Sequence, residues 1–188
     1  MIVDDCMVSK DRNDILSCKS ISTPLGEMVA GVSSTTLHLL EFADRPERFA
    51  SILSSPSLTV SETSTPLTDQ LQRELDEYFS GKRREFSIPC SIEGTPFQNS
   101  VWEALREIPY GETRSYGWLA RRLGDPKSVR AVARANGQNG IAILVPCHRV
   151  IGGDGSLTGY AGGLDRKKRL LQLEGATSPS PEGQERLF

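Results

Sequence analysis

The chain has 188 residues and a formal net charge of −2, and 37% of its residues are hydrophobic. This length allows one domain of ordinary size or two small ones, and no apolar run approaches the roughly 18 residues of a membrane span. Four cysteines at wide spacings, without a CxxC pair, argue against a disulfide framework or a compact zinc knuckle. The charged N-terminus lacks the apolar core of a signal peptide, so we expect a cytoplasmic protein with reduced thiols and no membrane partner.

The charge is unevenly distributed along the chain. Residues 96–176 hold 12 Lys and Arg against 7 Asp and Glu, an excess of +5, and the remaining residues carry −7. A basic second half joined to an acidic first half suits a polyanion that faces only the second half.

The first half combines strand patterns with one clear helix. "STPLGEMVAGVSSTTLHLLEFAD" alternates β-rich pieces with Gly and Ser turns and predicts strands or hairpins. In "TPLTDQLQRELDEYFSGK", Pro66 stands early, leucines recur every fourth residue and Gly81 stands in the stop position, so this stretch predicts a helix. "REFSIPCSIEGTPF" is then extended, and its Pro and Gly residues predict a domain boundary.

The second half is predicted to be mainly helical. Apolar stripes mark three short helices: Val101, Leu105 and Ile108; Tyr116, Leu119, Ala120 and Leu123; and Val129, Val132 and Ala133. A Gly-Asp-Pro turn separates the second helix from the third, whose other face carries Lys127, Arg130 and Arg134. Two short helices across a glycine-containing turn, the second with a basic face, are typical of a helix-turn-helix, although a basic face is also typical of any solvated helix.

"AILVPCHRV" places a cysteine at the end of an apolar run. We interpret residues 141–145 as a buried strand that ends at Pro146. Cys147 would then lie beside a loop, where a free cysteine is most often a small buried hydrophobe. Because neighbours on an extended segment point to opposite sides, His148 can assist a reactive Cys147 only through a bent backbone or a bridging water.

The motifs of this half resemble one protein family. "RAVARANGQNGIAIL", "PCHRV" and "IGGDGSLTGYAGGLDRKKRLLQLEG", with "FQNSVWEALREIPYGETRSYGWLARRLGDP" and "LDEYFSGKRREFSIPCSIEGTPF" upstream, resemble the O6-alkylguanine-DNA alkyltransferases, also called methylated-DNA–protein-cysteine methyltransferases. The resemblance implies an α+β fold with an RNase H-like α/β domain at residues 1–95. It also implies a mainly helical DNA-binding domain, with the helix-turn-helix and the active-site cysteine, at residues 96–176. Residues 177–188, rich in Ser, Pro and Gly, are expected to be a flexible tail.

The resemblance also implies a reaction. Cys147 would attack the alkyl carbon of O6-alkylguanine, or of O4-alkylthymine, in DNA and keep the alkyl group irreversibly, in a single turnover that needs no cofactor. His148 would take the thiol proton through a water, Glu174 would orient that imidazole, and Asn139 would brace the turn before the active-site strand. Without the resemblance, these residues read as a polar strand end, a helix carboxylate and an ordinary Asn-Gly turn.

The same resemblance implies how DNA is held. A stacked base hides its O6 atom from a buried thiol, so the damaged base must be flipped out of the duplex. Arg130 would fill the gap in the base stack, Tyr116 would crowd the 3′ phosphate, and small residues would let the recognition helix approach the minor groove closely. We therefore expect a DNA-binding surface at Tyr116, Arg130, Ala131, Arg134, Ala135 and Gly137, and a base pocket at Val145, Cys147, Tyr160 and Gly162.

Other classes of function fit parts of the pattern. A non-catalytic DNA-binding module would flip alkylated bases without reacting, but relatives of that kind replace the acceptor cysteine, which is intact here. A thiol hydrolase built on the same cysteine and histidine would need an oxyanion device that is not evident in the sequence. A zinc site could draw on Cys6, Cys18, His38 and Cys90. Their spacing matches no standard site, so we expect no metal.

The chain ends on two large apolar residues after a Ser- and Pro-rich stretch. "QERLF" resembles the Gln-x-x-Leu-Phe peptides by which bacterial repair and replication proteins dock on the sliding clamp. The alternative is a frayed terminus, or one folded back on its own domain. We predict a clamp contact through Gln184, Leu187 and Phe188, in a protein that acts as a monomer on double-stranded DNA.

Overall fold

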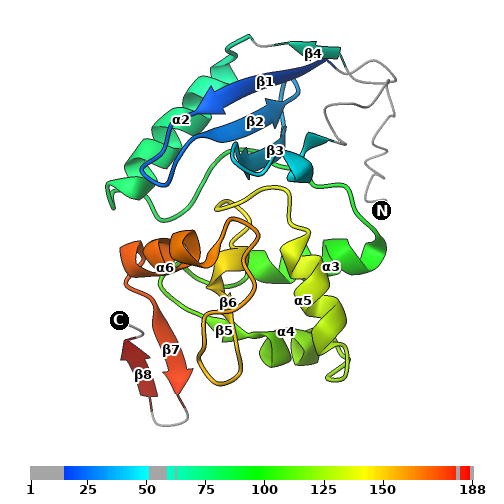
Figure 1. The fold of residues 1–188 in the computed structure, drawn as a ribbon, viewed down its shortest axis with the longest axis vertical. Helices are drawn as coiled ribbons and strands as arrows, with labels where there is room; N and C mark the ends of the chain where they lie inside the picture. The colour runs from blue at the N-terminus through cyan, green and yellow to red at the C-terminus, as the bar shows by residue number, and fades with distance from the viewer. Residues whose placement is uncertain (1–14, 51–58, 62, 181–182, 187–188) are drawn as a thin grey trace, which may run out of the picture.

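The computed structural model describes residues 15–50, 59–61, 63–180 and 183–186. They form a mixed α+β fold, in which a four-stranded sheet with one long helix stands above a mainly helical second half (Figure 1). One buried apolar cluster runs through both halves, from Ile21 in the sheet to Leu170 in the last helix. The α+β class expected from the sequence is confirmed.

The sheet runs in the order β3-β2-β1-β4. Its strands are β1 (Ile15–Ile21), β2 (Met28–Val32), β3 (Leu37–Phe42) and β4 (Thr59–Ser61). The first three pair antiparallel, and β4 pairs parallel with β1. β2 and β3 confirm the strands predicted in this stretch. β1 lies before the stretch in which strands were predicted. The sequence did not reveal it, because Ser17, Lys19 and Ser20 interrupt its apolar residues.

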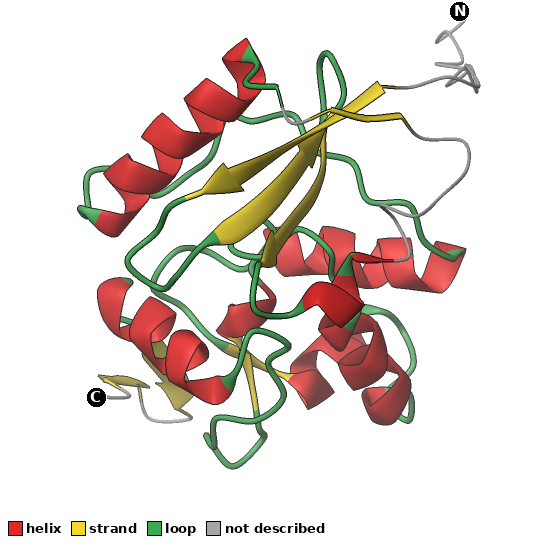
Figure 2. Ribbon diagram, turned by 45° about the horizontal axis from the view of Figure 1, so that its top comes forward, coloured by secondary structure: helices red, strands yellow, loops and turns green. Residues whose placement is uncertain are grey.

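Helix α2 (Pro66–Phe79) forms where the leucine spacing predicted a helix, along one side of the sheet (Figure 2). Its first turn is closed by a reciprocal capping box. The Thr65 hydroxyl accepts from the Thr68 amide at 3.2 Å, and the Thr68 hydroxyl accepts from the Thr65 amide at 2.9 Å. In the last turn, Tyr78 lies on the buried face, so the helix carries an aromatic hydroxyl into the interior of the protein.

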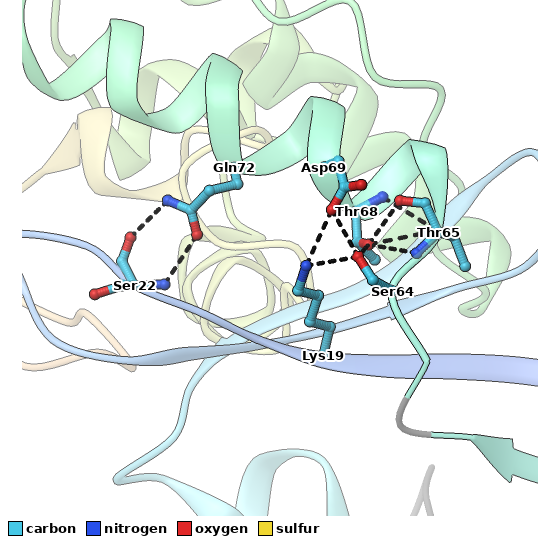
Figure 3. Close-up of polar contacts among 7 residues, drawn as sticks. All are labelled: Lys19, Ser22, Ser64, Thr65, Thr68, Asp69 and Gln72. Carbon is cyan, nitrogen blue, oxygen red and sulfur yellow. Dashed lines mark hydrogen bonds and ion pairs between the residues drawn. The ribbon is translucent and has the colours of Figure 1, made fainter.

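Polar contacts fix α2 against β1 and the turn that follows it (Figure 3). Lys19 Nζ lies 3.0 Å from Asp69 Oδ1. The Gln72 side chain donates to the carbonyl of Ser22 at 2.9 Å and accepts from its amide at 3.1 Å. Because Gln72 satisfies both backbone groups of Ser22, it fixes the position of the helix along the sheet.

The second half is built from short helices. Its elements are α3 (Pro96–Arg106), β5 (Arg114–Ser115), α4 (Tyr116–Arg122), α5 (Val129–Gly137), the 3-10 turn η2 (Cys147–Arg149), β6 (Val150–Ile151) and α6 (Leu164–Leu173). Helices α3, α4 and α5 confirm the three predicted from apolar stripes. A further 3-10 turn, η1 (Pro46–Arg48), follows β3. No helix within the described ranges is both long and apolar enough to cross a membrane.

Helices α4 and α5 pack on each other across a tight turn. The Ser115 hydroxyl caps α4 by accepting from the Trp118 amide at 3.0 Å. Gly124 ends the helix with a φ of +86°, a conformation that favours glycine. The pair of helices expected for a helix-turn-helix therefore lies at the predicted positions, with α5 exposed at one edge of the molecule (Figure 1).

The strand predicted over residues 141–145 is wrong. Ile141 makes one isolated bridge to Leu40 of β3, after which the chain turns, and Ile143 has a φ of +73°. The Asn139 side chain accounts for this, because its Oδ1 accepts from the Ile141 amide at 3.0 Å while its Nδ2 donates to the Val145 carbonyl at 2.9 Å. One amide group thus holds both ends of the segment in a compact turn that an extended strand could not make.

The tail differs from the expected flexible segment. β7 (Thr177–Ser180) and β8 (Gly183–Arg186) pair as an antiparallel hairpin. The turn-like composition obscured this pairing in the sequence. Gln184 lies in β8, whereas Leu187 and Phe188 of the predicted clamp motif lie outside the described residues, as does Cys6.

The capping box makes a testable contribution to stability. We expect Thr65→Ala to lower the free energy of unfolding by about 1 kcal/mol, because an N-cap hydroxyl is lost. Lys19→Met is the comparison, since it removes the partly exposed ion pair with Asp69 and the hydrogen bond to Ser64 and should cost less than the loss of the cap. Urea denaturation of both variants measures the free energy of unfolding. Equal losses of this free energy in the two variants would contradict a specific contribution of the capping box.

Candidate active site

Cys147 begins the 3-10 turn η2, at the point where the chain leaves the turn held by Asn139. Only 5% of the residue is exposed. Its sulfur accepts a hydrogen bond from Asn139 Nδ2 at 3.1 Å. The bent backbone that an assisting His148 requires is therefore present, because Cys147 and His148 lie in a helical turn rather than in an extended strand.

The surroundings of Cys147 keep it protonated at rest. Burial raises the pKa of its thiol to about 11, and the hydrogen bond from Asn139 offsets only part of this effect. A thiol in this state is a weak nucleophile at neutral pH. A reaction at Cys147 therefore needs a nearby group that takes the thiol proton.

His148, the next residue along the chain, is the candidate for that group. Its ring is fully buried, with Nε2 3.0 Å from Glu174 Oε1. Nδ1 has no hydrogen-bond partner within the described part of the chain. Burial lowers the pKa of His148, and the Glu174 carboxylate opposes this shift. A neutral imidazole that donates from Nε2 to Glu174 leaves the lone pair of Nδ1 available to accept a proton.

Glu174, the C-cap residue of α6, collects donors from three parts of the chain. Besides His148, it accepts from Tyr78 Oη at 2.7 Å, from Arg149 Nε and Nη2 at 2.9 Å each, and from the Gly111 amide at 3.2 Å. Burial raises the pKa of Glu174, but His148 and Arg149 outweigh it and hold the pKa well below its usual range. The carboxylate therefore stays ionised and keeps the imidazole in one orientation.

Lys167 is a buried cation near the thiol, and the sequence predicted no role for it in the site. Its ammonium donates to the carbonyls of Val150 and Thr158 at 2.5 Å each. Burial lowers its pKa to about 8, and the electrostatic influence of Cys147 acts in the opposite direction. Because both protein partners of the ammonium are neutral carbonyls, Lys167 adds positive potential where a thiolate would form.

Of the residues expected to line the base pocket, Val145 and Tyr160 lie close to Cys147, and Gly162 lies against Tyr160. Tyr160 lies with its ring edge-on to His148 at 6.5 Å, and its buried hydroxyl has no partner among the described residues. At Gly162 a Cβ would come within 2.7 Å of Tyr160 and 2.8 Å of Phe42, so only glycine fits. Val145 is buried, and its carbonyl is held by Asn139.

Tyr116 connects the recognition helices to this pocket. It opens α4 and is 9% exposed. Its hydroxyl donates to the Gly159 carbonyl at 3.1 Å, and burial raises its pKa to about 12. The sequence placed Tyr116 on the DNA surface. In the structure it also fixes the loop that precedes Tyr160.

Helix α5 presents three of its predicted DNA-binding residues to the surface: Arg130, Ala131 and Arg134 are exposed. Ala135 is a correction to the expected surface, because it is 2% exposed and faces the core, where its carbonyl accepts from Trp102 Nε1 at 2.9 Å. Gly137 is half-buried at the end of the helix. The exposed surface of α5 is therefore narrower than the sequence predicted.

A partly buried ion pair between η1 and the sheet holds the end of α5. Arg48 pairs with Glu41 of β3 at 2.7 Å and donates to the carbonyls of Gly137 at 2.9 Å and Asn139 at 2.8 Å. The sequence contained no signal for this contact, since about 90 residues separate the arginine from both carbonyls. It fixes the segment that carries the Asn139 amide toward the thiol.

Metal ligands do not gather in the described residues. Within them, no three His, Cys, Asp or Glu side chains lie close enough together to hold an ion. His38 instead contacts the Ser33 hydroxyl at 3.1 Å, and Cys90 accepts from Arg106 at 3.1 Å.

A buried cysteine beside a histidine–carboxylate pair, next to an exposed basic helix, defines a protein with a thiol centre and a nucleic-acid surface. Residues 96–176 match the family model described as "6-O-methylguanine DNA methyltransferase, DNA binding domain". Residues 16–92 match "6-O-methylguanine DNA methyltransferase, ribonuclease-like domain". The chain therefore belongs to the methylated-DNA–protein-cysteine methyltransferase family, as the motifs predicted, and it is an enzyme of that class.

Individual relatives agree with this assignment. The methylated-DNA–protein-cysteine methyltransferase of Mycobacterium leprae is 42% identical over 160 residues, which are 85% of this chain and 93% of the relative. That of Methanosarcina acetivorans is 58% identical over 107 residues, 57% of this chain and 69% of the relative. The crystal structure of the Mycobacterium tuberculosis O6-methylguanine methyltransferase superposes with a TM-score of 0.73 at 40% identity, covering 85% of this chain and 93% of the other.

The buried carboxylate predicts a pH-dependent stability. Because the pKa of Glu174 is depressed in the folded state, its contribution is present above the unfolded value near 4.5 and is lost as the pH falls below it. We expect Glu174→Gln to cost about 3 kcal/mol at pH 7, since Arg149 loses its ionic partner, and to flatten the acid dependence. Urea titrations from pH 7 to pH 3 measure both effects.

Glu107→Gln is the control, because Glu107 pairs with Arg122 at the surface, where both side chains are about half exposed. A loss as large in this variant as in Glu174→Gln would contradict the role given to burial.

Proposed function

We propose that this protein repairs DNA by moving an alkyl group from O6 of guanine, or O4 of thymine, to Cys147 Sγ, once per molecule, after the damaged base has been flipped out of the duplex. The observation that carries the proposal is the buried centre in which Asn139 Nδ2 donates to the sulfur of Cys147 while His148 is held by Glu174. A related structure at 41% identity, with a TM-score of 0.74 and coverage of 84% of this chain and 92% of the other, is titled Mycobacterium tuberculosis OGT in complex with DNA.

The bonds and protons of the transfer balance within this site. The thiol proton passes to His148 Nδ1 through a water, and the thiolate attacks the alkyl carbon. A carbon–sulfur bond forms as the carbon–oxygen bond breaks, and the electron pair stays on the base, which takes up the released proton. The product thioether has no good leaving group, so the cysteine is not regenerated.

The electrostatic surroundings favour this step at the moment of reaction. The Asn139 amide and the Lys167 ammonium stabilise negative charge on the sulfur of Cys147. Glu174 stabilises the imidazolium that His148 becomes. These groups are in place beforehand, so little reorganisation is needed when the proton moves.

The proposal also includes the residues that contact DNA. We propose that Arg130, exposed on α5, fills the gap left by the flipped base. Arg134 contacts the DNA backbone, and the small side chain of Ala131 lets α5 approach the minor groove closely. Tyr116 crowds the neighbouring phosphate, and Tyr160 closes over the extruded base.

The division into residues 1–95, 96–176 and 177–188 stays part of this proposal, with the family models matching 16–92 and 96–176. That the protein acts as a cytoplasmic monomer also stays a prediction. Docking of Gln184, Leu187 and Phe188 on a sliding clamp stays a prediction.

The acceptor is tested by the mass of the protein. A duplex with a single O6-methylguanine should add about 14 Da to the intact protein, stoichiometrically, at the peptide that contains Cys147. Cys147→Ser should abolish the gain and leave DNA affinity nearly unchanged, because a serine alkoxide is far harder to form than a thiolate. A gain on another cysteine, or comparable transfer by the serine variant, would overturn the mechanism.

Base flipping is tested through Arg130. Arg130→Ala should slow repair of a paired duplex about tenfold or more, but slow reaction with a single strand or the free modified base much less, because little stacking must be broken there. Arg134→Ala is the matched control on the same helix, and its loss should track DNA affinity. If Arg130→Ala slowed all three substrates equally, the arginine would supply only general charge.

A further inference from the structure

We propose that Tyr78 of helix α2 is a positioning residue for the reaction, because its hydroxyl holds the Glu174 carboxylate in the orientation that His148 needs. This inference rests on the proposed function. It assigns the first half of the chain a part in the chemistry that the second half carries.

The contact is direct and buried. Tyr78 Oη donates to Glu174 Oε1 at 2.7 Å across 96 residues of sequence, and neither side chain is exposed. The same oxygen receives His148 Nε2 at 3.0 Å and Arg149 Nη2 at 2.9 Å. Three donors to this one oxygen leave the Glu174 carboxylate little freedom to rotate. Losing one of the donors therefore alters the hydrogen bond between the carboxylate and the imidazole.

The aromatic ring of Tyr78 is itself fixed. It packs against Phe79 and Phe86 with centroid distances of 5.3 Å each, and edge-on against Tyr110 at 6.1 Å. Helix α2 is in turn anchored to the sheet through Lys19 and Gln72 (Figure 3). A hydroxyl held on so rigid a support can orient its acceptor precisely.

The hydroxyl acts only as a donor. Burial raises the pKa of Tyr78 well above its ordinary value, and the neighbouring Glu174 carboxylate raises it further. The phenol therefore stays protonated between pH 5 and pH 9, the range of the test below. Its hydrogen bond withdraws negative charge from the oxygen that faces His148.

Several other groups face this carboxylate and its histidine. They are Arg149 from η2, Tyr110 and the Gly111 amide from the segment after α3, Tyr160 from the loop before α6 and Lys167 from α6; Arg84 lies over the Tyr110 ring. Among them, Tyr110 offers a comparison, because its hydroxyl donates to the Leu173 carbonyl at 3.2 Å and not to the carboxylate.

The direction in which the pH profile should shift follows from the negative charge on Glu174. Removing the Tyr78 hydroxyl leaves more negative charge on Glu174, which stabilises the imidazolium form of His148 and raises its pKa. Transfer requires the neutral imidazole, so the acid limb of the rate profile should move to higher pH. Glu174→Gln removes the charge itself and should move the same limb to lower pH.

The test compares single-turnover rates of Tyr78→Phe, Tyr110→Phe, Glu174→Gln and wild type on one O6-methylguanine duplex between pH 5 and pH 9. For Tyr78→Phe we expect the acid-limb midpoint to rise by about half a pH unit, and the plateau rate to fall about threefold. Tyr110→Phe removes a hydroxyl from the same aromatic cluster and should keep the wild-type midpoint.

Each outcome has a defined meaning. A Tyr78→Phe profile that superposes on that of wild type, or that shifts equally in Tyr110→Phe, would overturn the role of Tyr78 while leaving the transfer reaction intact. Absence of transfer by the wild-type protein would instead contradict the proposed function. A lower plateau with an unmoved midpoint would assign Tyr78 to packing alone, which also overturns the inference.

Discussion

The structure depends on one buried negative charge. A carboxylate inside a protein is stable only when donors replace the water it has lost, and Glu174 finds them on α2, on the segment after α3 and on η2. Bringing those donors together forces both halves of the chain to meet at one point. The histidine of the site is oriented as part of the same arrangement.

A second constraint is the burial of a thiol that has to become a nucleophile. Burial keeps the Cys147 thiol protonated and shields it from solvent, while a donating amide and a buried lysine stand ready for the thiolate. A permanently ionised thiol would be exposed to oxidation and to unrelated electrophiles. In the mechanism proposed above, the nucleophilicity of the sulfur therefore depends on proton removal by His148.

The sequence was a good guide where the signal was local. Leucine spacing located α2, apolar stripes located α3 to α5, and the motif around Cys147 identified the family. It failed where a side chain overrides backbone preference, as Asn139 does in turning residues 141–145 away from a strand. It gave no role to Tyr78, Lys167 or the Glu41–Arg48 pair, because tertiary contacts between distant segments leave no periodicity in a single sequence.

We infer that Glu174 holds a neutral His148 with its proton on Nε2 and its Nδ1 lone pair free. Nitrogen-15 NMR of selectively labelled histidine, with His38→Gln to assign the two rings, tests this most directly. We expect a protonated Nε2 and an unprotonated Nδ1 at pH 7, despite the adjacent carboxylate. A doubly protonated ring at that pH, or the proton on Nδ1, would contradict it.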